Sequence, residues 1–148
     1  MLPDADGIAF VLGIPYGSML GHRGITHSIL FAAVVGLSAG MITFVTTRGL
    51  FSRTALVLYF ALVTVSHPLL DALTNGGRGV ALFAPLNGAR YFFPWRPIEV
   101  SPIGLRFFSE RGLEVIASEV VWVWLPALII WSAVWIYRKT REGNKEGS

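Results

Sequence analysis

The sequence contains no cysteine and few charged residues. Without cysteine, neither a disulfide framework nor a thiolate metal site is possible, and the redox compartment cannot be inferred. Only 14% of the residues are charged, whereas 53% are hydrophobic and the mean hydropathy is +0.60. A soluble domain has roughly a quarter of its residues charged. So much apolar surface requires either a lipid bilayer or an extensive oligomer interface.

Three long stretches contain no charged residue, and their length favours the bilayer. They are residues 24–47, 54–70 and 120–137. Because a membrane span needs about 20 apolar residues, we expect an all-α integral membrane protein with about three transmembrane helices. These helices are predicted over about residues 29–47, 54–73 and 115–137.

Two further segments are too irregular to be spans. Residues 8–20 are apolar but short, and glycines and a proline interrupt them, which favours a re-entrant or interfacial segment. Between residues 75 and 114, an Asn-Gly-Gly sequence and several prolines exclude a long helix, so we expect a structured loop. We therefore predict one membrane-embedded domain over residues 1–137 and a basic, disordered tail over residues 138–148.

The basic residues bear on orientation and on partners. The turn at residues 48–53 and the basic tail lie on one side if there are three spans, and the positive-inside rule makes that side cytoplasmic. The five arginines of the loop favour the opposite orientation; they are Arg78, Arg90, Arg96, Arg106 and Arg111. A basic flank directly after a hydrophobic run is typical of a cytoplasmic stop-transfer flank, so we expect the bilayer, not nucleic acid, as partner.

All three histidines and all three aspartates fall in three short motifs beside the predicted spans. They are Asp4, Asp6, His22, His27, His67 and Asp71. The two histidine-containing motifs precede the first span and end the second, so an antiparallel hairpin brings them to the same membrane face. The motif of Asp4 and Asp6 is predicted to be extended or turn-like and to offer two carboxylates.

These residue types suit a divalent metal. His67 and Asp71 have i, i+4 spacing and share a helix face, and imidazole with carboxylate binds zinc, or manganese where carboxylates dominate. The carboxylate can equally orient a ligating histidine. Each motif alone is more typical of a hydrogen-bonded pair or a cap. Ionisable residues clustered near a bilayer are costly and usually functional, which favours a metal site.

Glu119 and the loop arginines are less specific. Glu119 lies near the start of the third span, where it is either a hydrogen-bonded interfacial residue or a ligand or general base. The side chains of Arg78, Arg90 and Arg96 are able to bind phosphate bidentately. Contact with lipid headgroups, or simple solvation, is more typical of any single arginine in such a loop.

Five motifs in order resemble the LexA-regulated, membrane-bound metal-dependent hydrolase family. They are Leu-Pro-Asp-Ala-Asp at residues 2–6, His-Arg-Gly-Ile-Thr-His-Ser at 22–28, His-Pro-Leu-Leu-Asp at 67–71 with Thr74 and Gly76, Ala-Arg-Tyr-Phe-Phe-Pro-Trp-Arg-Pro at 89–97, and Ser-Glu-Val-Val-Trp-Val-Trp-Leu-Pro at 118–126. The resemblance implies an inner-membrane hydrolase, distantly similar to zinc phospholipase C and P1-type nucleases. Members of that family begin with a further hydrophobic helix carrying a Thr-His pair, so the resemblance implies either that the start of this sequence is misassigned or that the domain is shortened by one span and one candidate ligand.

We therefore expect metal-assisted hydrolysis of a phosphoester or lipid-like substrate. The bound metal would activate water, with Asp71 or Glu119 accepting the proton. Two hypotheses compete with this one: a metal-binding or ion-handling site without enzymatic activity, and a purely structural subunit. The predicted spans are free of ionisable residues in their middle apart from Glu119, which favours a site facing the membrane surface over a transport pathway.

Overall fold

The computed structural model describes residues 2–102 and 107–146, and for residues 143–146 only the backbone. The chain divides into two compact units, Met1–Arg96 and Pro97–Ser148, and each is described by itself. The first contains η1 (Pro3–Gly7), α1 (Ile8–Val11), η2 (Ile25–His27), α2 (Ile29–Thr46) and α3 (Arg53–Ala72). The second contains α4 (Glu110–Glu119), the π-helical η4 (Val120–Trp124) and α5 (Leu125–Glu146).

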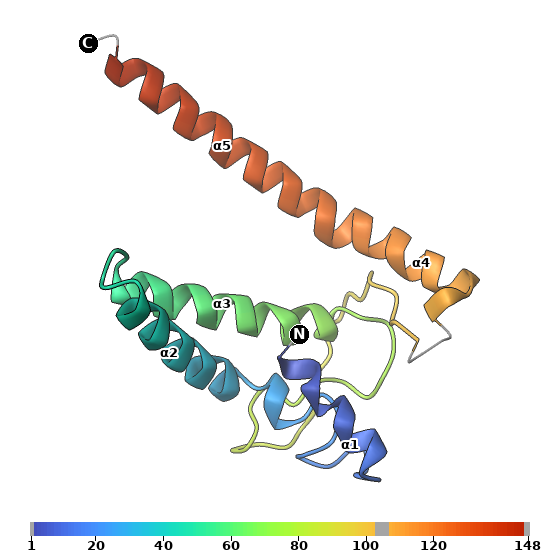
Figure 1. Ribbon diagram of the computed structural model, residues 1–148. Helices are drawn as coiled ribbons and strands as arrows, with labels where there is room; N and C mark the ends of the chain where they lie inside the picture. The colour runs from blue at the N-terminus through green and yellow to red at the C-terminus, as the bar shows by residue number, and fades with distance from the viewer. Residues whose placement is uncertain (1, 103–106, 147–148) are drawn as a thin grey trace. The chain divides into compact units, whose positions relative to one another are not determined.

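Helices α2 and α3 form the predicted antiparallel hairpin (Figure 1). Both begin at serine caps, because the hydroxyl oxygens of Ser28 and Ser52 accept backbone N–H groups of the first turn. The connecting turn reverses the chain through Arg48 and Gly49, whose φ angles are 52° and 74°. Both helices are long and apolar enough to cross a membrane, as predicted.

Two glycines one helical turn apart let α2 and α3 approach closely. A Cβ atom on Gly36 would lie 2.5 Å from the Cβ atom of Ala61, and a Cβ atom on Gly40 would lie 2.7 Å from the Cα atom of Val57. Small residues at this spacing are typical of packed membrane helices, where backbone contact replaces hydrophobic burial as the source of association. The hairpin is therefore a rigid support for whatever lies at its open end.

The loop after α3 folds back over the open end of the hairpin. Val80 and Tyr91 form an antiparallel bridge with N···O distances of 3.0 and 2.9 Å, and Val80 is fully buried. The backbone N–H of Ala81 donates to the carbonyl of Arg23, and that of Phe93 donates to the carbonyl of Ala72. The expected structured loop is thus tied both to the segment before α2 and to the end of α3.

The second unit is one long helix made of α4, η4 and α5. Its stretch Glu110–Glu142 is the third candidate span, in agreement with the predicted third transmembrane helix. The wide π-helical turn ends two residues before Pro126, whose missing N–H and bulky ring disfavour regular α-helical bonding.

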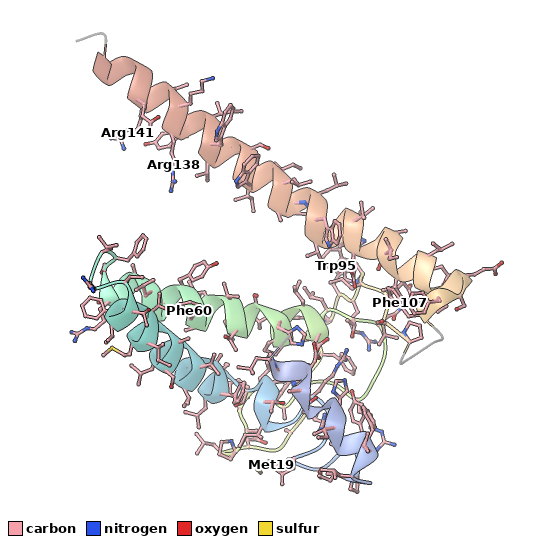
Figure 2. All side chains as sticks on the ribbon, in the orientation of Figure 1. Met19, Phe60, Trp95, Phe107, Arg138 and Arg141 are labelled. Carbon is pink, nitrogen blue, oxygen red and sulfur yellow. The ribbon has the colours of Figure 1, made fainter. Side chains whose placement is uncertain are left out.

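The helix continues to Glu146 where we expected a disordered tail from residue 138, and Arg138 and Arg141 project from it (Figure 2). The division of the chain into a domain over residues 1–137 and a tail stays a prediction. Arg106, one of the five loop arginines that bear on orientation, lies outside the described residues, as do the last two residues of the predicted tail.

Candidate metal centre

Three short elements bring the predicted ligands together at the open end of the hairpin. Asp4 and Asp6 lie on η1, His27 ends η2, and His67 and Asp71 lie on the last turns of α3. The segment that contains Asp4 and Asp6 is a 3₁₀ helix, whereas we expected an extended or turn-like conformation. With three residues per turn, side chains two apart point in different directions. This geometry separates the two carboxylates.

Four side chains form what we call the inner group: Asp4, His27, His67 and Asp71. Their nearest ligand atoms all lie within 4.8 Å of one another. The Nε2 atom of His67 is 3.1 Å from Asp4 Oδ1 and 3.8 Å from Asp71 Oδ2. The Nε2 atom of His27 is 3.2 Å from Asp71 Oδ2 and 3.7 Å from Asp4 Oδ1.

These separations fit a metal ion. Tetrahedral zinc with nitrogen and oxygen ligands at about 2.0–2.1 Å places its ligand atoms about 3.3–3.4 Å apart. Two imidazoles and two carboxylates are also a donor set that divalent ions accept. His27 Nε2 and Asp71 Oδ2 are buried and face each other at 3.2 Å, and neither atom has another hydrogen-bond partner among the described residues. A cation between them, either a proton or a metal ion, would satisfy both.

Asp6 and His22 lie outside the inner group and form an outer layer with Thr26. One oxygen of Asp6 contacts His22 Nδ1 at 2.7 Å. The other accepts the Thr26 hydroxyl at 2.6 Å and lies 3.1 Å from His27 Nδ1. A carboxylate on the second nitrogen of a ligating histidine fixes the ring and its tautomer. The predicted six residues are thus brought together in two layers, and the ligand role of each stays a prediction.

The outer layer also sets the charge of these groups. Burial alone would raise the pKa of Asp6, but contacts from His22, His27 and Thr26 outweigh burial and lower it well below its usual range. Burial alone would lower the pKa of His27, yet the neighbouring carboxylates of Asp6 and Asp71 raise it to about 9. Without metal, His27 therefore holds a proton at neutral pH.

Arg23 is a central residue that the sequence analysis did not single out. Its guanidinium donates to Asp71 Oδ1 at 2.9 Å and to Thr74 Oγ1 at 3.2 Å, and its backbone N–H donates to Asp6 Oδ2 at 3.0 Å. The residue is buried and has a φ of 59°. The only sequence signal is its position between His22 and Gly24. A Cβ atom on Gly24 would meet the carbonyl oxygen of Met19 at 2.2 Å, so this tight loop requires glycine.

Among the described loop arginines, Arg90 is engaged in hydrogen bonds to the backbone. The guanidinium of Arg90 donates to carbonyl oxygens on both sides of the loop, and the shortest bond is 2.6 Å to Tyr16. The other acceptors are the carbonyls of Ser18, His22, Arg23 and Gly79. Arg78 and Arg96 instead lie over the rings of Tyr16 and Phe92. Arg90 is therefore a structural residue, contrary to the phosphate-binding hypothesis.

Glu119 ends α4 in the second unit and is partly exposed. Its predicted role as a ligand or general base therefore stays a prediction.

The fold and the buried polar site define an α-helical integral membrane protein with three candidate spans. The model of the YdjM inner membrane protein family matches residues 1–142. The chain belongs to this family of inner membrane proteins. It is similar to the inner membrane protein YbcI of Escherichia coli, with 42% identity over 94% of this chain and 80% of that protein. No solved structure matches the chain.

Proposed function

We propose that this protein is a membrane-bound, metal-dependent hydrolase that acts on phosphoesters. The observation that carries the proposal is a pair of buried atoms, His27 Nε2 and Asp71 Oδ2, that have no hydrogen-bond partner other than each other among the described residues. They face each other at 3.2 Å, next to Asp4 and His67. The motif resemblance to the LexA-regulated, metal-dependent hydrolase family supports the choice of reaction.

The side chains have separable roles in this proposal. The inner group holds the ion, Asp6 orients His27 from behind, and Arg23 holds one oxygen of Asp71 so that the other faces the group. When bound, a divalent ion lowers the pKa of a bound water and polarises the phosphoryl oxygen. Hydrolysis forms a phosphorus–oxygen bond from water, breaks the bond to the alcohol and delivers a proton to the departing alcohol. A spare carboxylate, either Asp71 or Glu119, is the proposed acceptor of the proton that the attacking water loses.

One observation favours a metal site without enzymatic activity. Four protein donors fill a tetrahedral zinc shell, and closed shells are typical of structural zinc, whereas catalytic sites keep one position open. The side chain of Asp4 is the most exposed of the four, at 43%, compared with 0% for His27 and 14% for His67. In the hydrolase proposal Asp4 is the ligand that yields a position to water or substrate.

The test is metal analysis followed by an activity assay. We expect the detergent-purified protein to hold zinc or manganese near stoichiometrically, and the variants His27→Ala and His67→Ala to lose it. His22→Ala is the matched control, because His22 lies in the outer layer and should retain most of the metal. A wild-type protein that stays metal-free after reconstitution contradicts both proposals. Bound metal without hydrolysis of bis(p-nitrophenyl) phosphate or lipid phosphoesters favours the site without activity.

A further inference from the structure

The segment that follows the two aspartates exposes an unusually apolar surface. No charged residue occurs between Asp6 and Arg23. Within this stretch large side chains are open to the surroundings in the first unit; they include Ile8 (63% exposed), Val11 (86%), Leu12 (65%) and Leu20 (66%). We call residues 8–20 the apolar cap. Contiguous apolar patches of this kind mark contact with a membrane or with another protein.

The apolar cap is held in a defined shape by its backbone. The N–H of Ile14 donates to the carbonyl of Ala9, and the N–H of Ile25 donates to the carbonyl of Met19. The guanidinium of Arg90 donates hydrogen bonds to the carbonyl oxygens of Tyr16 and Ser18. The outward direction of the apolar side chains is therefore built into the fold. Met19, labelled in Figure 2, lies on this segment.

The position of the apolar cap in the chain, between η1 and α2, places it at a membrane face. It follows η1 directly, and η1 is joined to α3 where Asp4 Oδ1 meets His67 Nε2 at 3.1 Å. It precedes the start of the span α2 by only a short turn and η2 (Figure 1). A segment that lies where one span begins and another ends is at headgroup depth. Short uncharged segments with exposed apolar side chains and a tyrosine are suited to that depth.

We propose that the apolar cap inserts into the interfacial layer of the bilayer and that the substrate of the inner group is a phosphate ester of a membrane lipid. The inference rests on the proposed function for the substrate, but not for the insertion. The exposed Arg78, stacked on Tyr16 of the cap, adds a cation at the same edge, which favours anionic lipid headgroups. The proposed substrate is thus a phosphoester that comes from the membrane and not from the water phase.

The absence of cysteine makes the insertion directly measurable. A single cysteine is introduced as Val11→Cys and labelled with an environment-sensitive NBD fluorophore in vesicles of phosphatidylethanolamine and phosphatidylglycerol. Glu142→Cys, at the charged C-terminal end of the stretch Glu110–Glu142, is the aqueous control, and Leu58→Cys on α3 is the membrane control. We expect quenching by lipids spin-labelled near the headgroup to be about twofold or more stronger at residue 11 than at residue 142. Equal quenching at these two positions overturns the insertion.

The source of the substrate is tested with a charged cap. The double variant Val11→Asp, Leu12→Asp should retain metal and hydrolysis of water-soluble bis(p-nitrophenyl) phosphate, while its hydrolysis of vesicle phosphatidylglycerol falls about tenfold. Leu86→Asp is the matched control, because Leu86 is 93% exposed but lies outside the cap. An equal loss in both variants, or no loss of lipid turnover in the double variant, overturns the lipid assignment.

The experiments distinguish a failure of the proposed function from a failure of the lipid assignment. If the wild-type protein hydrolyses neither compound, the proposed function and the lipid substrate both fail, while the NBD measurement still decides the insertion. If the soluble diester is hydrolysed and vesicle lipid is not, the hydrolase stands and the lipid assignment is wrong. If residue 11 is shielded in detergent as well as in vesicles, the cap is covered by protein, either a second copy or the second unit, and the membrane assignment is wrong.

Discussion

Both ends of the α2–α3 hairpin carry charged residues, but these residues are exposed at the turn and buried at the open end. At the turn, Arg48 and Arg53 are exposed, carry charge of one sign and have no acidic neighbour in the sequence. At the open end, Arg23, Asp71 and His27 are buried or nearly so and contact one another. Exposed arginines beside a bilayer are explained by topology alone. Buried charges of both signs are costly and indicate a site.

The largest effect is expected from breaking the buried ion pair. Asp71→Ala leaves the Arg23 guanidinium, whose side chain is only 7% exposed, without its carboxylate partner. Removing one member of a buried pair costs about 3–5 kcal/mol, so the midpoint of chemical or thermal unfolding in detergent should fall markedly. Arg53→Ala at the turn end should change the midpoint little. Similar midpoints for the two variants would contradict the contrast between the ends.

A second substitution is expected to lower the stability of the whole hairpin, because it lies between the two ends. In Gly36→Leu the new side chain meets the backbone and Cβ of Ala61, whose Cβ atom would be 2.5 Å from the first added carbon. Overpacking of this kind costs about 1–3 kcal/mol, measured as a lower unfolding midpoint. Gly88→Ala is the control, because a Cβ atom there meets no atom within 4 Å. Unchanged stability of the leucine variant would mean that the helices are not packed through this glycine.

The outer layer provides a smaller effect that is confined to the open end. Asp6→Asn removes the charge that faces His27 Nδ1 and His22 Nδ1, while an amide oxygen is still able to accept the N–H of Arg23. Loss of such a supporting carboxylate typically lowers metal affinity 10–100-fold, or about 1.4–2.7 kcal/mol. Zinc titration calorimetry measures it. Ser52→Ala, which removes the cap at the turn end, should leave the affinity unchanged.

The smallest predicted effect is a pH dependence found only at the open end. The pKa of His27 is raised to about 9, above its ordinary value of 6.5. Its protonated form thus stabilises the metal-free fold fully below about pH 6.5, and that contribution is lost as the pH rises through about 9. Because metal displaces this proton, zinc affinity should increase about tenfold from pH 7 to pH 8. A flat profile in the wild type would contradict the assignment of His27.

Much of this arrangement follows from patterns in the sequence. The uncharged runs predicted the three candidate spans, and the short basic turn predicted the hairpin, from which the convergence of the motifs of His27 and His67 follows. These inferences succeed because bilayer thickness and loop length are strong constraints. The family comparison independently supports the inner membrane location.

The finer arrangement depends on backbone geometry that the sequence pattern does not reveal. The different directions of Asp4 and Asp6 follow from the 3₁₀ helix, and two aspartates one residue apart give no sign of it. The role of Arg23 depends on its positive φ and on its burial beneath the later loop. Arg90 looked like a surface arginine because the carbonyl groups that it binds are distant in the sequence.

The tie between η1 and α3 has a consequence for biosynthesis. Asp4 and His67 meet at 3.1 Å although 63 positions separate them in the chain, and α2 begins and α3 ends on the same side as η1. During synthesis, Asp4 is therefore able to contact His67 only after both helices have been inserted into the bilayer. In the proposed metal site, loading would therefore follow insertion, because a chain arrested after its first span has only part of the proposed donor set. Occupancy of that site would then report correct membrane integration of the hairpin.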